Sequence, residues 1–465
     1  MTSTTHTDSR DHLKPFFQGA PTRPFPAVAR NQRGRSLRHL FLFLLCVYSL
    51  NVHTLSSFLP RPYPNFILLA MVGLFGSLFY SGHVLSGRGK IRIEGFLFLA
   101  WLLWAFIGMI DRSLFFWDLI NQPLAGVLLF LYFSSSISNR DQLTFVLKGF
   151  LTGGLLLVAA IFITGEFAEF ESRTGAFSTS TTKTGLGMFL TGNRNTFAYL
   201  ILLSIFAAFY SISVARFRWR IVLLVSIAAF SVFIVLSASR KAFIVEILFI
   251  LIWAYLTNAR MLARRTRFVV LFLILSVVLY HSTTYVYDHT YLGERLQPVE
   301  SFESGGLAAF SGVSSRISQY EVGLNLFLDY PIWGVGLGNY SKFDPSGLSP
   351  HSEYVAIGTQ TGLVGLLLYF TPYVLMLSRL RKQRKAHAAF GFAGGYDYKA
   401  AGCLFAITMS ILIIDFGRWN FSHHATYILL GSICGYSYHL QAARSKTFVD
   451  SSLRSLPDKT MPAAR

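Results

Sequence analysis

The chain has 465 residues, of which 53% are hydrophobic and only 14% are charged. Soluble domains carry about a quarter charged residues, so this composition is typical of a membrane protein and excludes a soluble enzyme. The net charge of +19 would suit a nucleic-acid binder only if the cations gathered on one soluble face. Because they fall between apolar runs instead, we expect no nucleic-acid partner.

Apolar runs of about 20 residues, the length of a membrane-crossing helix, recur along the chain. They lie near residues 40–59, 66–85, 94–111, 115–134, 143–163, 197–214, 220–238, 242–258, 268–286, 352–378, 398–416 and 424–441. These runs predict an all-α polytopic membrane protein with about twelve transmembrane helices. Its membrane domain spans residues 39–442, between basic tails at 1–38 and 443–465.

The distribution of cations predicts the orientation of these helices. An even number of spans places both termini on one side, and most of the 41 Lys and Arg residues lie in the tails and short loops of that side. By the positive-inside rule that side is the cytoplasm. The outer side then carries two long loops, residues 164–196 and 287–351. Since long loops in compact proteins are usually functional, we expect the chemistry on the outer side.

An amphipathic helix is predicted within the second long loop. Its apolar stripe consists of Ile317, Tyr320, Leu324, Phe327 and Leu328. Ser314 or Ser315 can cap this helix and Pro331 ends it. We expect the helix to lie along the outer membrane surface.

Cations are scarce on the outer side, so those that remain require an explanation. They include Arg173, Lys183, Arg194, Arg240, Lys241, Arg295, Arg316 and Arg418. Arg194 precedes an apolar run whose helix Asn195 or Thr196 can cap, so it can form an anion site beside free backbone N–H groups. The alternative is an arginine that only anchors the helix at the membrane interface.

Arg240 and Lys241 occupy a tight outer hairpin, against the positive-inside trend. Such a position is costly unless the cation serves a ligand, and we assign that role to Arg240. For Lys241 we favour an interface anchor.

Three alternating glycines, Gly334, Gly336 and Gly338, occur late in the second long loop. No strand precedes them, which excludes a dinucleotide-binding turn. Their backbone N–H groups could approach an anion closely, or the segment could be an ordinary turn.

His351 lies where the second long loop meets the next apolar run, which places its imidazole at the membrane surface. Histidine is the side chain best suited to proton transfer near neutral pH. A metal site is conceivable from His351, Glu353, Asp415, His423 and His424. No recognised ligand spacing or D-x-D pair is present, so we expect neither a metal nor a cofactor.

Four stretches, in order, resemble the bacterial O-antigen ligase and polymerase superfamily. They are G-N-R-N-T-F-A-Y-L, S-A-S-R-K-A-F, R-I-S-Q-Y-E-V-G-L-N-L-F-L-D-Y-P-I-W-G-V-G-L-G-N-Y and H-S-E-Y-V-A-I-G-T-Q-T-G-L-V-G-L-L-L-Y, best matched over residues 190–370. The resemblance implies a bacterial inner-membrane glycosyltransferase. Such an enzyme moves a glycan from a polyprenyl (undecaprenyl) diphosphate carrier to a periplasmic acceptor without a metal.

The resemblance also implies roles for individual residues. Arg240 and Arg316 match the arginines that hold the donor diphosphate, Arg194 is a further phosphate contact, and His351 matches the general base. From the residues themselves, Glu353 and the three glycines are possible loop contacts. The chain departs from the usual pattern at Lys241, Ser352 and Gln360.

Three functions fit this sequence. The first, which we favour, is a ligase that joins the lipid-linked polysaccharide to lipid A-core. The second is a polymerase whose acceptor is a growing polysaccharide, and the motifs do not separate it from a ligase. The third is a transporter of the same lipids, which would need ionisable residues facing a mid-membrane cavity. Glu246, Lys148 and Asp118 are the deep candidates for such a cavity.

Overall fold

The computed structural model describes residues 26–58, 67–68, 70–71, 92–109, 117–166, 188–191, 193–214, 217–257, 307–345, 347, 350–389, 395–418 and 423–454. These residues form helices and turns, and no strand occurs among them. The predicted span at 268–286 and most of that at 66–85 lie outside the described residues, as do residues 167–187 of the first long loop and 287–306 of the second.

The long helices coincide with the other predicted apolar runs. They are α1 (Pro26–Phe58), α3 (Ile93–Ile107), α4 (Trp117–Ser136), α5 (Arg140–Ile163), α8 (Arg194–Val214), α9 (Phe217–Leu236), α10 (Arg240–Thr257), α16 (Glu353–Ala389), α17 (Tyr396–Asp415) and α18 (His424–Arg454). Helices α1 and α18 extend beyond the predicted limits of the membrane domain.

Five of the described helices are long and apolar enough to cross a membrane. These cover Arg140–Ile163, Arg194–Ser213, Arg218–Leu236, Glu353–Ala389 and Tyr396–Asp415. Shorter apolar helices cover Arg38–Val52, Ile93–Ile107 and Pro123–Ser136. The all-helical class is therefore confirmed for the described residues and fits a multi-pass membrane protein, whereas the total of about twelve spans stays a prediction.

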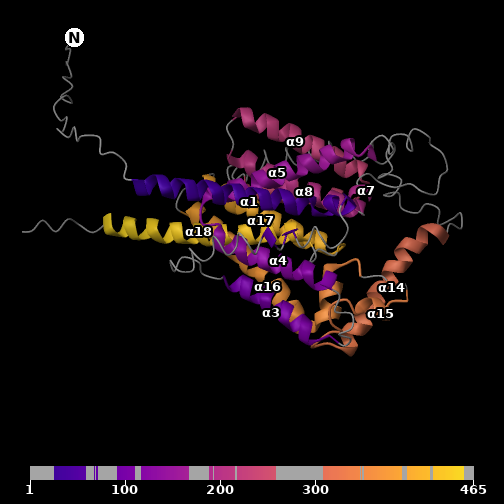
Figure 1. Cartoon of the computed structure of the whole chain (residues 1–465). Coiled ribbons are helices and arrows are strands. Elements are labelled where there is room, and N and C mark those ends of the chain that lie inside the picture. Colours follow the sequence, from indigo (N-terminus) through magenta and orange to yellow (C-terminus); the bar gives the residue numbers. More distant parts are fainter. Residues whose placement is uncertain are drawn as a thin grey trace, which may run out of the picture.

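The helices pack mainly in pairs, α1 along α5 and α4 along α18 (Figure 1). Helix α17 packs against both α16 and α10. Small residues allow the close approaches that drive helix association in lipid. A Cβ on Gly149 would lie 2.7 Å from the Cβ of Cys46, and one on Gly126 would lie 2.4 Å from the ring of Tyr427.

Apolar side chains also cover the outside of the bundle. On α9 the exposed residues include Ile221, Val222, Leu224, Val225 and Val232. An apolar surface of this extent indicates contact with a bilayer.

At one end of the bundle, arginine side chains form hydrogen bonds or ion pairs between neighbouring helices. The contacts join Arg38 to the carbonyl of Ser136, Arg379 to the carboxylate of Glu94, and Arg384 to the hydroxyl of Tyr398. We call this the cationic end. The first turns of α8, α10, α16 and α18 lie at the opposite end, together with the last turn of α17.

Helix α14 (Leu307–Asp329) corresponds to the amphipathic helix predicted in the second long loop. It ends before Pro331 as predicted, but it begins seven residues before Ser314, so the predicted capping serine was wrong. Tyr320, Leu324 and Leu328 of the apolar stripe are exposed. These three side chains therefore face away from the protein, which suits a helix against a lipid surface.

Candidate functional site

A short turn after α17 contacts three helix starts through three consecutive residues. We call it the 416–418 turn. The ring centroid of Phe416 lies 4.4 Å from that of Tyr354, in the first turn of α16. A Cβ on Gly417 would lie 2.7 Å from the Cδ of Lys241, in the first turn of α10. The third residue, Arg418, reaches the first turn of α8.

Arg418 is buried and binds two helix starts at once. Its guanidinium donates to the carbonyl of Asn195 and, at 3.1 Å, to the hydroxyl of Thr196, both on α8. It also contacts His423 Nε2 at 2.8 Å, directly before α18. Because a guanidinium only donates, this nitrogen of His423 accepts. The guanidinium lies 4.4 Å above the centroid of the Tyr199 ring.

Two buried carboxylates accompany this guanidinium. Burial lowers the pKa of Arg418 to about 10, and the charges of Asp415 and Glu353 oppose that shift, so Arg418 stays cationic at neutral pH. Glu353 Oε1 accepts a hydrogen bond of 2.5 Å from the hydroxyl of Tyr369. The sequence predicted Glu353 as a possible loop contact. Its side chain is instead fully buried and contacts Tyr369, a residue of the same helix.

The start of α8 is fixed by Asn193. Its side-chain oxygen accepts from the N–H of Asn195 at 2.8 Å, and its carbonyl accepts from the N–H of Thr196. The cap is therefore Asn193, and the prediction of Asn195 or Thr196 was wrong. Arg194 is the first helical residue and is half-buried.

The start of α10 is joined to that of α8. Ala238 has a positive φ of 55°, a conformation uncommon for residues other than glycine. Ser239 follows, and its hydroxyl donates to the side-chain oxygen of Asn195 at 2.9 Å. Half-buried Arg240 then begins α10. Two adjacent helix N-termini thus each carry an arginine, an arrangement that favours anions.

The glycine-rich segment is docked on α16 at a break in that helix. Gly334, Gly336 and Gly338 have φ values of 68°, 87° and 81°, and Gly362 inside α16 has 63°. The N–H of Gly334 donates to the carbonyl of Tyr330, that of Gly336 to the carbonyl of Gln360, and that of Gly338 to the side chain of Gln360. Because all three glycine N–H groups are donated within the protein, the geometry supports a structural turn rather than an anion cradle.

A pair of stacked tryptophans connects α3 to the glycine-rich segment and to α16. The rings of Trp104 and Trp333 stack with centroids 4.2 Å apart, and Trp104 Nε1 donates to the carbonyl of Thr361 at 3.0 Å. The first half of α16 is thereby fixed from two sides.

His351 lies just before this fixed helix start. The carbonyl of the buried Ser352 accepts from the N–H of Ala356 at 2.9 Å, so Ser352 occupies the cap position. His351 itself is exposed. The imidazole is accessible at the junction of loop and helix, where the sequence predicted it.

Some predicted residues are not brought together. Arg316 belongs to α14, but its side chain lies outside the described residues. Within the part of the chain that the structure describes, no three His, Cys, Asp or Glu side chains form a group that could hold a metal ion. The conceivable cluster of His351, Glu353, Asp415 and the two neighbouring histidines therefore does not form there.

Sequence reasoning missed the role of Arg418. The available signal was a cation in a short outer connection, but its contacts on α8 are more than 220 residues away and no local pattern predicts them.

Comparison with known proteins finds a family similarity in the central part of the chain. Residues 226–370 match the family model described as O-antigen ligase. This segment includes Arg240, Arg316, the glycine-rich segment and His351. No curated protein matches the chain. The match covers 145 of the 465 residues, and over this segment the chain is similar to the O-antigen ligase family.

Proposed function

We propose that the protein transfers a glycan from a polyprenyl (undecaprenyl) diphosphate to a hydroxyl of lipid A-core, at the periplasmic face of the bacterial inner membrane. The observation that carries this proposal is the convergence of helix starts at one end of the bundle. Arg194 and Arg240 begin two helices joined by the Ser239–Asn195 hydrogen bond, and exposed His351 precedes a third.

The donor diphosphate suits the two arginine-bearing helix starts. The positive ends of the helix dipoles favour an anion, and guanidinium groups bind phosphate oxygens through paired hydrogen bonds. In a partly dehydrated site such groups stabilise the charge that develops on a leaving diphosphate. Arg194 and Arg240 supply this charge, and we assign Arg316 on α14 to the same diphosphate because of its place in the motif resemblance.

The acceptor side of the reaction is assigned to His351. The acceptor oxygen attacks the anomeric carbon, the bond from that carbon to the diphosphate oxygen breaks, and the hydroxyl proton passes to the imidazole. The polyprenyl diphosphate leaves with the bonding electron pair. A direct displacement of this kind inverts the anomeric carbon. The exposure of His351 supports this role because a base must come within hydrogen-bond reach of the acceptor.

Arg418 is a positioning residue in this proposal. It is buried and its donors are directed to Asn195, Thr196 and His423, so it holds the α8 start rather than the substrate. Its contribution to transfer is indirect, through the position of Arg194.

A polymerase would use the same chemistry on a growing polysaccharide. A transporter is less well supported, because the deep carboxylate of Glu246 accepts a hydrogen bond from Ser231 on the neighbouring helix and is buried in the packing.

The lipopolysaccharide of a deletion strain distinguishes the two transferases. A ligase defect leaves the core without polysaccharide, whereas a polymerase defect leaves single repeat units on the core. A reconstituted assay in excess EDTA, with a lipid-linked glycan and lipid A-core, tests the reaction directly. Failure of the folded protein to transfer glycan under these conditions would contradict the proposal.

A further inference from the structure

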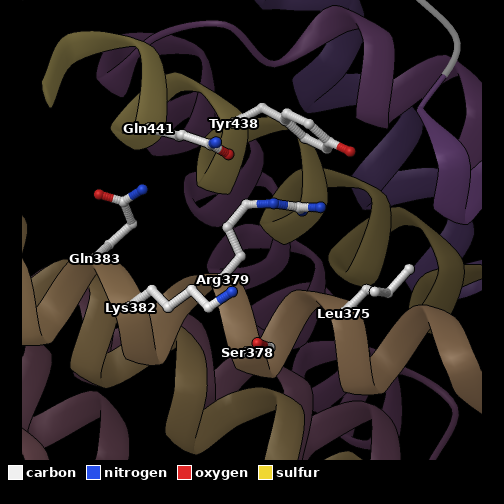
Figure 2. Close-up of a pocket in the computed structure, with 7 residues that line it drawn as sticks. All are labelled: Leu375, Ser378, Arg379, Lys382, Gln383, Tyr438 and Gln441. Atoms are coloured by element: carbon white, nitrogen blue, oxygen red, sulfur yellow. The ribbon is translucent and has the colours of Figure 1, made fainter. Parts of the chain in front are cut away.

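A cavity of about 380 Å³ lies between α16 and α18, at the cationic end and away from the 416–418 turn (Figure 2). This volume is in the range of small-molecule sites, roughly 300 to 1,000 Å³. The polar residues that line it are Ser378, Arg379, Lys382, Gln383, Tyr438 and Gln441. Ser378, Lys382 and Gln441 are exposed, so the cavity opens to the surface beside them.

The position along α16 places this cavity at the other membrane surface. Arg379 follows the break in α16 at Gly362 by 17 residues, which is about 25 Å at about 1.5 Å per residue. The hydrocarbon core of a bilayer is about 30 Å thick. The contact of Arg379 with Glu94 is one of those that define the cationic end. With the start of α16 at the outer surface, the cavity therefore lies near the headgroups of the cytoplasmic leaflet.

Positive charge predominates around the cavity. Arg379 pairs with Glu94 at 2.5 Å, and its guanidinium lies 3.8 Å from the centroid of the Tyr438 ring. The guanidinium of Arg92 lies 4.2 Å from the same centroid. Lys382 adds an exposed ammonium. Among the described residues here, three cations face a single carboxylate, which favours an anionic ligand.

The apolar side of the cavity points to a lipid. Leu375 lines the cavity one helical turn before Arg379, and its neighbour Val374 is 61% exposed. An acyl chain could follow this apolar surface toward the bilayer centre, whereas a free phosphate ester would leave it uncovered.

We propose that this cavity binds the headgroup of an anionic glycerophospholipid in the cytoplasmic leaflet. The phosphate binds the exposed ammonium of Lys382, beside the guanidinium of Arg379, which also donates to Glu94 and to the hydroxyl of Ser437. The site is independent of glycosyl transfer, because it lies at the end of α16 opposite to His351.

The test measures phosphatidylglycerol bound to the purified full-length protein by native mass spectrometry. Phosphatidylcholine serves as the neutral lipid and sn-glycerol 3-phosphate as the soluble phosphate ester. Lys382→Gln removes the exposed cation of the cavity. Arg381→Gln is the matched control, because Arg381 is an exposed neighbour that does not line the cavity. Ser378→Phe fills the opening without a change in charge.

We expect the wild-type protein and Arg381→Gln to retain phosphatidylglycerol over phosphatidylcholine. Lys382→Gln and Ser378→Phe should each weaken this binding about tenfold, with unchanged melting temperature in lipid-free detergent. If Lys382→Gln and Arg381→Gln lose phosphatidylglycerol binding equally, the binding depends only on general surface charge, and the proposal is wrong. Displacement by glycerol 3-phosphate at similar concentration would identify a soluble ligand and overturn the lipid assignment. Should Lys382→Gln fail to fold, normal binding by Ser378→Phe would still refute the site.

Discussion

Arg418 concentrates several long-range contacts in one buried side chain. It donates to the α8 start and to His423, and it covers one face of Tyr199. Removing one partner from a buried hydrogen bond costs the desolvation of the group left behind, about 1 to 3 kcal/mol. Arg418 therefore matters to stability as well as to the position of Arg194.

We predict that Arg418→Met lowers the free energy of unfolding by about 3 kcal/mol, because several buried acceptors lose their donor. Thermal unfolding in detergent measures this loss, with Arg218→Met, an exposed arginine of α9, as the matched control. Arg418→Lys should recover only part of the stability, since one ammonium cannot reach all the acceptors. Equal melting temperatures for Arg418→Met and Arg218→Met would show that the contacts contribute little.

A different outcome is expected at Arg240, which is half-buried at the start of α10. Arg240→Ala should weaken binding of the donor diphosphate by about 1.5 to 3 kcal/mol, the contribution of a charge-assisted hydrogen bond. Arg240→Lys should also transfer poorly, because an ammonium does not reproduce the planar guanidinium. Donor affinity and transfer rate are measured at equal membrane expression. Wild-type rates in both variants would exclude Arg240 from the donor site.

His351 provides the test of proton transfer. We predict that His351→Ala lowers the transfer rate by about 10² to 10⁴ while donor affinity and melting temperature stay near wild type. The reason is that His351 is exposed before the cap of α16 and is not part of its buried packing. Parallel loss of donor affinity and stability would indicate instead that His351 anchors the loop.

At the scale of elements, the sequence predicts helices well and their breaks poorly. The apolar runs locate α8, α10 and α17 because a bilayer dictates length and hydrophobicity. The break at Gly362 lies inside such a run, and its compensating hydrogen bonds come from Val335 and Gly336 on a distant loop. No local periodicity specifies that pairing, so the glycines could equally have belonged to an anion site.

The docking of the glycine-rich segment can be tested by substitution. A Cβ on Gly336 would lie 2.3 Å from the Cα of Met109, whereas one on Gly347 would meet nothing within 4 Å. Both residues have positive φ, so Gly347→Ala carries the backbone strain, about 1 to 3 kcal/mol, without the clash. We predict that Gly336→Ala destabilises the protein clearly more than Gly347→Ala in thermal unfolding. Equal effects would mean that the segment is not closely docked.

At the scale of the whole molecule, the two ends of the helix bundle differ in their content of cationic side chains. The cationic end holds Arg38, Arg140, Arg379 and Arg384 close to aromatic, carbonyl or carboxylate partners. The first described helix begins and the last one ends at this same end (Figure 1). Among the described residues, the opposite end carries fewer cations, and Arg194 and Arg240 lie there at helix starts. This asymmetry agrees with a cytoplasmic cationic end and a periplasmic site.

The final prediction tests that orientation. Alkaline phosphatase, active only in the periplasm, should be active when inserted at Ser304 in the second long loop and inactive when fused after Arg465. A fluorescent protein that folds only in the cytoplasm should give the reverse pattern, which controls for expression. The physical reason is that cationic loops are retained on the cytoplasmic side during insertion. If both positions report the same compartment, the number or direction of spans between them differs from our prediction, and His351 cannot be assigned to the periplasmic face.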